Sequence, residues 1–333
     1  MTDPPTAQLR AKNLTVDVVI GGHAAPIVND VSFDVAAGGA LGIVGESGCG
    51  KSTLALALMG LVGRGVRIRA EALELGDIDL TNRKHLRSHS VRGGKIGMVF
   101  QEPMTSLDPA FTVGSQLIEV LRRHHDLSKA QARERAAEIL HDVELPDAEQ
   151  RLNQFPHEMS GGMRQRVCIG LALCGDPSVL IADEPTTALD VSTQAQILEL
   201  LKRLRRDRNM TVILISHDLG VIADFADHMM VMYAGQVVES GDVFEVFESP
   251  KHPYTAALVT SIPNASSGEE RLGFIPGSPP PVGEGIQGCA FAPRCDYVDV
   301  PRCTSSPVEL RRDGAGHAFR CLRSEEISLQ GVS

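Results

Sequence analysis

The segment that most constrains this chain is a glycine-rich loop placed between an apolar strand and a helix. Leu41–Val44 is a short apolar run, Gly45-Glu-Ser-Gly-Cys-Gly-Lys-Ser follows it, and Thr53–Val62 has a helical pattern of apolar residues. Glycines at the tight points let successive backbone N–H groups approach a polyanion that side chains would block. Strand, loop and helix together predict an α/β fold with a phosphate site where the helix begins.

Two positions of this loop have specific expected roles. Lys51 is expected to reach the β- and γ-phosphates of a nucleotide as a point charge, and Ser52 to offer its hydroxyl to Mg²⁺. The alternative is a glycine turn that matches by accident, and the strand-loop-helix context argues against it. The predicted phosphate-site residues are Gly45, Glu46, Ser47, Gly48, Cys49, Gly50, Lys51, Ser52 and Thr53.

A second apolar run, Val179–Ala182, ends in the acidic pair Asp183 and Glu184. In doubly wound folds, ligands gather at the carboxyl ends of the strands, beside the phosphate loop. Asp183 is expected to hold Mg²⁺ through water, and Glu184 to polarise the water that attacks the nucleotide. The alternative is a solvated acidic turn, which the presence of the phosphate loop makes the weaker interpretation.

Strands and helices alternate along most of the chain, which favours a mostly parallel sheet covered on both faces. An antiparallel sheet is expected near the N-terminus. The other expected strands are Leu14–Val19, Val28–Val35, Ile96–Phe100, Thr211–Ser216, His228–Tyr233 and Gln236–Glu239. The other expected helices are Val113–Arg123, Ala130–Val143, Ser160–Leu173, Val191–Arg206 and Leu219–Phe225.

Charge and hydropathy exclude several classes of protein. The net charge of −10 argues against a nucleic-acid partner, which usually meets a basic face. No apolar run reaches the ~18 residues that a membrane-spanning helix needs. The polar segment Met1–Lys12 lacks the apolar core of a secretory signal. We therefore expect a soluble, cytosolic chain whose role at a membrane, if it has one, comes through partners.

Six ordered motifs over roughly residues 10–245 resemble the ATP-binding cassette (ABC) family. Besides the phosphate loop and the acidic strand, they are Gln101 after a strand, Met159–Gln165, Ala188–Asp190 and Ser216–Asp218. The resemblance implies a P-loop NTPase cassette with a RecA-like parallel core, an N-terminal antiparallel β subdomain and a helical subdomain. It also makes the phosphate site an ATP site that works with Mg²⁺.

The resemblance assigns catalytic roles residue by residue. Gln101 is the residue that senses Mg²⁺ and a membrane permease, and it joins Ser52 and Asp183 as the expected ligands of the ion. His217 contacts the γ-phosphate, so Glu184, His217 and Gln101 form the expected catalytic set. Regulatory cassettes that bind ATP without hydrolysing it usually lose the glutamate or the histidine. Both are present here, which favours hydrolysis.

A different set of residues serves the nucleotide of a second subunit. In the family, the signature turn, here Ser160, Gly161, Gly162 and Gln165, binds the γ-phosphate of ATP held by the opposite cassette. The backbone N–H groups of such a turn and the helix that follows it make an anion site. Asp190 belongs to a loop that crosses the dimer interface. The resemblance therefore implies that two subunits sandwich two nucleotides.

The chain departs from the family pattern at two places. Cassettes usually carry an aromatic residue that stacks on adenine, but no Phe, Tyr or Trp precedes Phe33. His23, in a Gly-Gly-His loop, is the expected substitute, with loosely held adenine as the alternative. The leucine that usually leads the signature is replaced by Met159.

Three longer segments resemble the ATPases of dipeptide/oligopeptide (and nickel) importers. They are Phe100–Pro109, Ala182–Val191 with Gln194–Gln196, and His252–Thr255. The resemblance implies a cassette over residues 1–250, with its helical subdomain at about 103–175, and a C-terminal extension over 251–333. Peptide uptake is the expected function, and nickel or another small solute is the alternative.

In that family two different ATPases pair beneath two permeases, and the wording of the motifs resembles the first ATPase of the pair. The implied partners are a second, related ABC ATPase, two transmembrane permeases and an extracytoplasmic solute-binding protein. The implied location is peripheral, at the cytoplasmic face of the inner membrane. Two other cassette classes fit poorly. Chromosome-type ATPases need a long coiled-coil insertion before the signature, and translation factors usually hold two cassettes.

The last part of the chain holds four cysteines spaced Cys289-x5-Cys295-x7-Cys303-x17-Cys321. Four thiolates can hold a [4Fe–4S] cluster. They can also hold structural zinc, although the common short spacings are missing. The third possibility is free thiols or disulfides. Because some peptide-importer ATPases carry a cluster here, the resemblance favours the cluster, with zinc second. His317 could replace one ligand of zinc and is otherwise expected at the surface.

Overall fold

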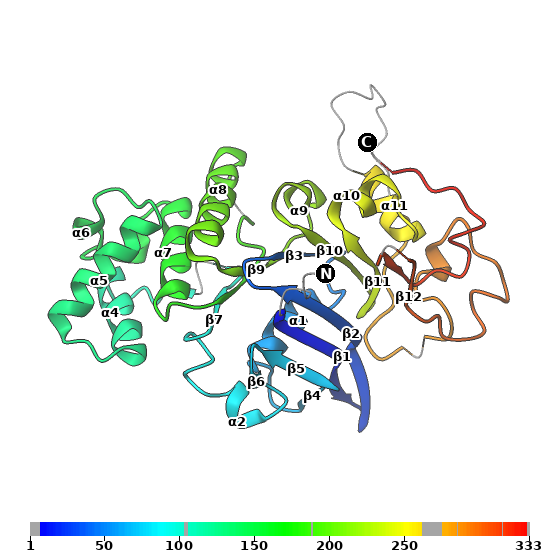
Figure 1. Cartoon of the computed structure of the whole chain (residues 1–333), viewed down its shortest axis with the longest axis horizontal. Helices are drawn as coiled ribbons and strands as arrows, with labels where there is room; N and C mark the ends of the chain where they lie inside the picture. The colour runs from blue at the N-terminus through cyan, green and yellow to red at the C-terminus, as the bar shows by residue number, and fades with distance from the viewer. Residues whose placement is uncertain are drawn as a thin grey trace, which may run out of the picture. The chain divides into compact units, whose positions relative to one another are not determined.

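The computed structural model forms two compact units, each assembled from segments distant in sequence (Figure 1). The first unit comprises Met1–Arg10, Asp34–Gly39 and Glu74–Ile215, and the second comprises Ala11–Phe33, Ala40–Leu73 and Ser216–Ser333. The structure describes residues 7–102, 106–187, 189–261, 275–284, 286–314 and 316–331. Residues 103–105 of the segment Phe100–Pro109, called the glutamine loop below, and residue 188 of the motif 188–190 lie outside these ranges.

The core of the first unit is a parallel sheet of three short, fully buried strands. They run in the order β9 (Thr211–Ile215), β8 (Val179–Asp183) and β7 (Ile96–Val99). Strands this rich in Val, Ile and Leu are typical of parallel sheets covered on both faces. The register pairs Asp183 with Ile215, which places the acidic residue at the carboxyl end of the sheet, as the sequence predicts.

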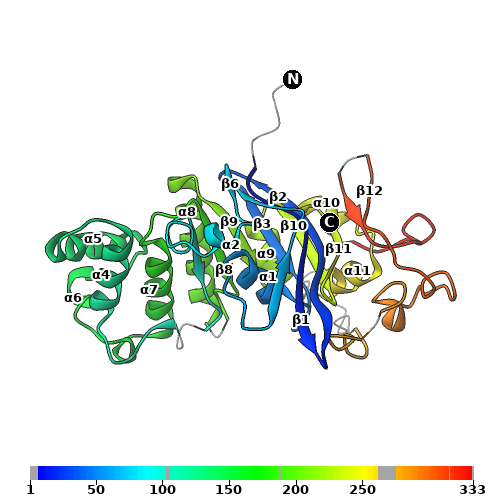
Figure 2. The ribbon, with the colours of Figure 1, turned by 90° about the horizontal axis from the view of Figure 1, so that it is seen from below.

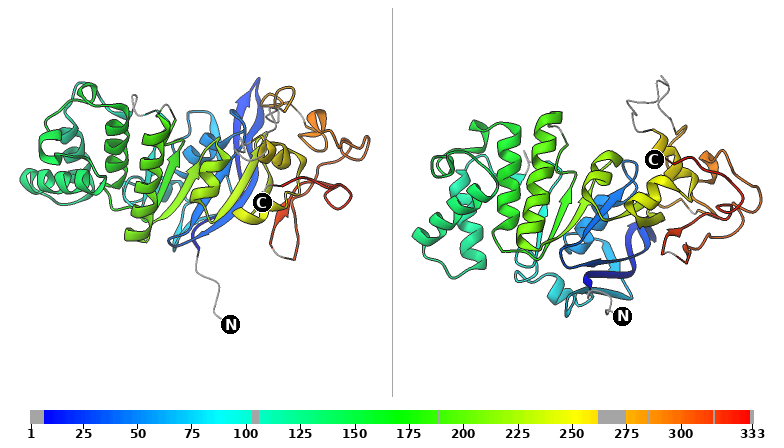
Figure 3. Two further views of the ribbon diagram at one scale, coloured as in Figure 1. Left: turned by 90° about the horizontal axis from the view of Figure 1, so that it is seen from above. Right: turned by 45° about the horizontal axis from the view of Figure 1, so that its top comes forward.

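The four longer helices of the first unit begin at side chains that cap their free N–H groups. Thr112, Ser128, Ser160 and Asp190 each accept a bond from a backbone N–H in the first helical turn. In Figures 2 and 3 the green helices α4–α7 gather into one group, apart from the short helix α2, and α7 also packs on β7. The helices are α2 (Arg83–Leu86), α4 (Val113–His124), α5 (Lys129–Asp142), α6 (Ala148–Arg151), α7 (Gly161–Leu173) and α8 (Val191–Arg208).

The second unit contains a mixed sheet in which the C-terminal extension supplies the last strands. Its order is β3 (Ala40–Val44), β10 (His228–Tyr233), β11 (Gln236–Asp242), β13 (Ala318–Phe319) and β12 (Arg311–Arg312). The β3–β10 pair is parallel, and the other pairs are antiparallel. The hairpin of β12 and β13 therefore covers the free edge of β11, which would otherwise present unpaired backbone groups (Figure 1).

Four helices of the second unit flank this sheet. They are α1 (Lys51–Leu58), α9 (Leu219–Phe225), α10 (Val243–Glu248) and α11 (Pro253–Thr260). α9 packs on β3, and both α10 and α11 contact β11. α11 begins at His252, whose Nδ1 accepts the N–H of Tyr254 at 3.1 Å. The extension is thus anchored to the cassette by a strand pairing and by a helix.

The N-terminal strands form the expected antiparallel pairings. β1 (Ala7–Ile20) and β2 (His23–Ala36) are joined by Gly21 and Gly22, whose positive φ angles of 58° and 85° suit a tight hairpin turn. β1 also pairs with β4 (Val66–Arg69). In the first unit β5 (Ala72–Leu75) pairs with β6 (Ile78–Asp79).

Most predicted elements are confirmed, with changed ends. β1 and β2 are longer than expected because the hairpin extends both strands to the Gly21–Gly22 turn. The first helix was expected to reach Val62 but ends at Leu58, since Gly60 adopts a φ of 60° and breaks the helical path. The sequence patterns did not predict β4–β6, the helices α2, α6, α10 and α11, or the β12–β13 hairpin. Among the described residues, no helix combines the length and the apolar character needed to cross a membrane.

Candidate nucleotide and cysteine sites

The phosphate loop has the backbone that its glycines predict. A Cβ atom on Gly45 would lie 2.2 Å from the carbonyl oxygen of Met232, and one on Gly50 would lie 2.9 Å from that of Ile27. Both positions therefore require glycine because the neighbouring backbone approaches so closely. Gly48 has a φ of 82° and nothing within 4 Å of its Cβ position. The loop is thus pressed against the sheet on one side and open at Gly48 on the other.

The lysine of the loop is held inside this curve. Nζ of Lys51 donates to the carbonyl oxygens of Gly45 at 2.7 Å and Glu46 at 3.1 Å, and the side chain is buried. Ser52 and Thr53 follow in the first turn of α1, where the helix N-terminus favours negative charge. The ammonium group therefore lies beside the backbone N–H groups with which it is expected to share a phosphate.

Arg294 of the C-terminal extension forms an ion pair with the phosphate loop. The guanidinium of Arg294, 5% exposed, forms a forked pair with Glu46, with Nη1–Oε2 at 2.7 Å and Nη2–Oε1 at 2.9 Å. Nη1 also donates to the hydroxyl of Tyr233 at 3.2 Å, and the remaining N–H groups donate to the carbonyls of Ile275 and Pro276. Each of the five guanidinium N–H groups thus has an acceptor, which fixes the geometry of the fork.

A second bond from the extension reaches the backbone of the same residue. The N–H of Glu46 donates to the hydroxyl of Tyr254 on α11 at 2.9 Å. Tyr233, Tyr254 and Phe291 pack as a buried aromatic cluster, with ring centroids 4.7–5.3 Å apart. Burial raises the pKa of the Tyr254 phenol, so it stays protonated at neutral pH. The roles of Arg294, Tyr233 and Tyr254 were not predicted, because no short motif signals contacts between residues so far apart.

A cavity opens beside the phosphate loop within the second unit. His23 lies in its wall, and Gly48 of the loop lies there too. The extension provides another part of the wall, which the sequence analysis did not predict. The apolar lining includes Ile20, Ile27, Val282, Ile286 and Pro279–Pro281. The role of His23 toward adenine remains a prediction.

The acidic strand end brings two predicted catalytic residues together. Glu184 follows β8 with a φ of 47°, a left-handed conformation that glutamate seldom adopts, and its N–H donates to the carbonyl of Ile215. Its Oε2 accepts from Nε2 of Gln101 at 3.0 Å and from the hydroxyl of Thr187 at 2.9 Å. Asp183 ends β8 and is buried. The carboxylate of Glu184 is thus oriented by two donors, of which Thr187 was not predicted.

The signature turn packs closely against the helix that follows Asp190. Ser160 caps α7 by accepting from the N–H of Met163, and the α carbon of Gly162 faces Thr193, where a Cβ would lie 2.6 Å from Cγ2. Asp190 caps α8 and accepts from both the N–H and the hydroxyl of Thr193. Bonds from Ser192 and Thr193 hold the pKa of the Asp190 carboxyl below its usual range.

The remaining predicted residues have contrasting environments. Ser160 is exposed, whereas the side chain of Gln165 is 1% exposed. His217 is exposed at the end of β9, just before the cap of α9. Gln101, Asp183 and Glu184 belong to the first unit, and the phosphate loop and His217 belong to the second. That these two sets serve one nucleotide remains a prediction.

The four C-terminal cysteines line one cavity in the second unit. Cys289, Cys295, Cys303 and Cys321 share it with apolar side chains such as Phe291 and Val308. Burial raises the pKa of the Cys289 and Cys321 thiols, and that of Cys295 to about 11. All seven cysteines of the chain lie in the described ranges and none forms a disulfide. The four cysteines therefore lie around one cavity without forming disulfides, and the metal site expected there stays a prediction.

These features are those of an ATP-binding cassette. The ABC transporter family model matches residues 28–187, and the model for the oligopeptide/dipeptide transporter C-terminal region matches residues 238–303. The chain belongs to the ATP-binding proteins of ABC transporters that carry this C-terminal region.

Three relatives align along most of their length. The chain is 47% identical over 331 residues to a putative peptide import ATP-binding protein of Brucella abortus, covering 96% of this chain and 97% of the relative. It is 44% identical to the dipeptide transport protein DppD of Escherichia coli, covering 92% and 94%. It is 50% identical over 296 residues to the oligopeptide transport protein OppD of Bacillus subtilis, covering 88% and 82%.

Solved cassettes share the fold. A dimeric post-hydrolysis structure of the cassette MJ0796, bound to ADP and phosphate, matches 71% of this chain and 98% of its own with a TM-score of 0.59 and 29% identity. CbiO1 of Clostridium perfringens matches 73% of this chain and 91% of its own with a TM-score of 0.60 and 26% identity. The predicted cassette fold is therefore confirmed.

The contacts of Glu46 predict that Arg294 supports ATP binding without touching ATP. Arg294→Ala removes the fork and leaves a phosphate-loop carboxylate without its partner, so we expect the Kd for ATP to rise about tenfold, roughly 1.4 kcal/mol. Isothermal titration with a non-hydrolysable ATP analogue measures this. Arg312→Ala, an exposed arginine of the same extension, is the matched control and should bind like the native chain. Equal affinity in both variants would contradict the supporting role.

Proposed function

We propose that this chain is the ATP-hydrolysing subunit of an importer of dipeptides or oligopeptides. One observation carries the proposal: identity of 44–50% to proteins named for peptide transport extends over the cassette and the C-terminal extension alike. A nickel importer of the same family is the alternative, and none of these relatives supports it. The solute itself is chosen by membrane and extracytoplasmic partners.

The phosphate loop would hold the nucleotide through its backbone. Gly48 leaves the inner curve of the loop open. On binding, Nζ of Lys51 would replace its hydrogen bonds to the carbonyls of Gly45 and Glu46 with bonds to phosphate oxygens. The exposed imidazole of His217 would contact the γ-phosphate. Such charge-assisted bonds position the nucleotide rather than react with it, as phosphoryl transfer requires.

Glu184 would orient the attacking water. Its carboxylate is fixed by Gln101 and Thr187, and both are neutral donors that leave its negative charge available. Ser52, Gln101 and Asp183 would supply the oxygen ligands that Mg²⁺ prefers. When bound there, Mg²⁺ would neutralise charge developing on the phosphates. The bond from Gln101 to Glu184 offers a route by which a permease that moves the glutamine loop would change catalysis.

The signature residues would act on the nucleotide of a second cassette. Ser160 is exposed at the N-terminus of α7, and its turn is held rigid by the contact of Gly162 with Thr193. ATP would favour the closed pair because only that state offers it contacts from both subunits. We propose a related second ATPase as the partner, beneath two permeases at the cytoplasmic face of the inner membrane. A solute-binding protein would complete the importer.

We further propose that the four cysteines hold a [4Fe–4S] cluster. Tetrahedral zinc with Zn–S bonds of about 2.3 Å needs its sulfurs about 3.8 Å apart. The single described group of three or more ligand atoms within 4.8 Å of one another does not include these cysteines. A cluster does not need its sulfurs so close together, because each cysteine binds a different iron. The apolar lining of the cavity also suits a group that should be kept from solvent.

Glu184→Gln should lower ATP hydrolysis by at least about 100-fold, since the amide cannot polarise water as the carboxylate does. ATP binding should persist, and the closed pair of cassettes should accumulate. Phosphate release by the assembled ATPase pair measures the first effect, and gel filtration with ATP measures the second. Glu199→Gln, an exposed glutamate on α8, should hydrolyse ATP normally. Unchanged turnover in Glu184→Gln would contradict the catalytic assignment.

Anaerobically purified protein should be brown and contain iron and sulfide in equal amounts. The Cys303→Ser variant should lose the visible absorption that gives the brown colour, because one iron loses its thiolate ligand. Cys168→Ala, which alters a buried cysteine of α7 far along the chain from the cavity, should retain it. The ultraviolet–visible spectrum and metal analysis provide the readout. A colourless protein that contains zinc would contradict the cluster and show that the cysteines hold structural zinc instead.

A further inference from the structure

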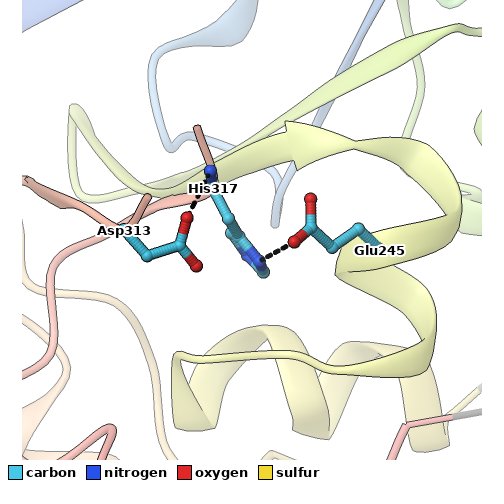
Figure 4. Close-up of side chains that lie close together, drawn as sticks. All are labelled: Glu245, Asp313 and His317. Carbon is cyan, nitrogen blue, oxygen red and sulfur yellow. Dashed lines mark hydrogen bonds and ion pairs between the residues drawn. The ribbon is translucent and has the colours of Figure 1, made fainter. Parts of the chain in front are cut away.

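A second group of candidate metal ligands lies away from the cysteines, at the edge of the second unit's sheet. It combines Glu245 on α10 with Asp313 and His317, which flank the turn between β12 and β13 (Figure 4). One ligand atom from each residue lies within 4.8 Å of the others. From the sequence, His317 was expected either as a substitute ligand at the cysteines or as a surface residue. The surface expectation is wrong, since His317 is fully buried.

A buried carboxylate behind the histidine determines which ring nitrogen carries hydrogen. Oε1 of Glu239 lies 2.7 Å from Nε2 of His317, and neither side chain is exposed. The backbone N–H groups of Lys251 and His252 also donate to Glu239, at 2.5 and 2.9 Å. Because Glu239 is acceptor-only when ionised, Nε2 of His317 must be its third donor. Two backbone bonds already stabilise the carboxylate, so it does not require a positively charged histidine.

The other ring nitrogen faces acidic groups without a hydrogen-bond partner. Nδ1 of His317 is buried and accepts no hydrogen bond from the described residues. Oε1 of Glu245 lies 3.8 Å from it, and Oδ1 of Asp313 accepts the backbone N–H of His317 at 3.0 Å. A neutral imidazole would thus turn its Nδ1 lone pair toward two carboxylates. That arrangement is repulsive unless a cation lies between them.

We propose that Glu245, Asp313 and His317 bind a divalent transition-metal ion of the zinc class. One imidazole nitrogen and two carboxylate oxygens form a ligand set that such ions accept, with a fourth position left for water. Glu239 would be the carboxylate that orients the ligating histidine, an arrangement found behind most metal-bound histidines. The side chain of Glu245 is 37% exposed, which gives an ion a path into the site.

The site would fasten the extension to the cassette. Glu245 belongs to α10, which follows β11, whereas Asp313 and His317 belong to the hairpin that pairs with β11. A bound ion would bridge these segments and add to the few hydrogen bonds of the two-residue strands. The proposal rests on these contacts alone and is independent of the transported solute and of what the cysteines bind.

The alternative to a metal ion at this site is a proton bound to Nδ1 of His317. An imidazolium between Glu239 and Glu245 would also relieve the repulsion, and it would need no metal. The two possibilities differ in what Nδ1 carries and in the response to added metal. An experiment with Co²⁺, which reports its ligands spectroscopically, separates them and also separates this site from the cysteines, since only thiolate ligands give sulfur-to-cobalt charge-transfer bands.

The full-length protein, with its cysteine site as purified, is titrated with Co²⁺ at neutral pH. We expect one equivalent to bind with visible absorption but without the sulfur-to-cobalt bands. Glu245→Gln and Asp313→Asn should each weaken this binding at least tenfold. Glu248→Gln, an exposed glutamate on the same helix, is the matched control and should bind like the native chain. Thermal unfolding without metal establishes that the variants remain folded.

Nitrogen-15 spectra of the histidine rings complete the test. With Co²⁺ replaced by diamagnetic Zn²⁺, the Nδ1 resonance of His317 should shift on addition of metal while Nε2 keeps its hydrogen. The proposal is overturned if Nδ1 carries a proton at neutral pH and Zn²⁺ leaves it unchanged. It is also overturned if Glu245→Gln and Asp313→Asn bind Co²⁺ as tightly as Glu248→Gln does.

Discussion

The guanidinium of Arg294 donates all five of its N–H groups, and two of them reach the carboxylate of Glu46 in the phosphate loop. The same loop residue gives its backbone N–H to Tyr254. A phosphate loop works because its backbone N–H groups are already aimed at the position of the phosphates, so contacts that fix the backbone contribute to binding without touching the ligand. Here those contacts come from the C-terminal extension.

This connection joins two sites that the sequence presents as separate. Arg294 immediately precedes Cys295, and Phe291 packs against both Tyr233 and Tyr254 while lining the cysteine cavity. Whatever fills that cavity therefore lies next to the residues that hold Glu46. The β12–β13 hairpin and the group around His317 fasten the far end of the extension to β11. The extension behaves as an integral part of the ATP-binding unit.

Local chemistry could be predicted from the sequence because it is written in short, contiguous patterns. The glycines of the phosphate loop, the strand ending in Asp183 and the cap at Ser160 all appear where the pattern placed them. The four C-terminal cysteines line one cavity, and it was the family resemblance, not their spacing, that favoured a common role for them. The exposed or buried state of single polar residues was less predictable, as the burial of Gln165 illustrates.

Contacts between distant segments could not be predicted in this way. Arg294 and Glu46 are 248 positions apart, and His317 and Glu239 are 78 apart. No local sequence pattern indicates which side chain will contact an arginine before a cysteine or a histidine in a turn. The contacts of the extension with Glu46, and the buried pair of His317 and Glu239, can be recognised only in the folded structure.

A double-mutant cycle on Glu46→Gln and Arg294→Gln tests this bracing most directly. ATP affinity and the free energy of unfolding are measured for both single variants and for the double variant. If the fork holds the loop, the effects are strongly non-additive, with a coupling energy of roughly 1–2 kcal/mol in ATP binding. Additivity within about 0.5 kcal/mol would mean that the two residues act independently and would contradict the account.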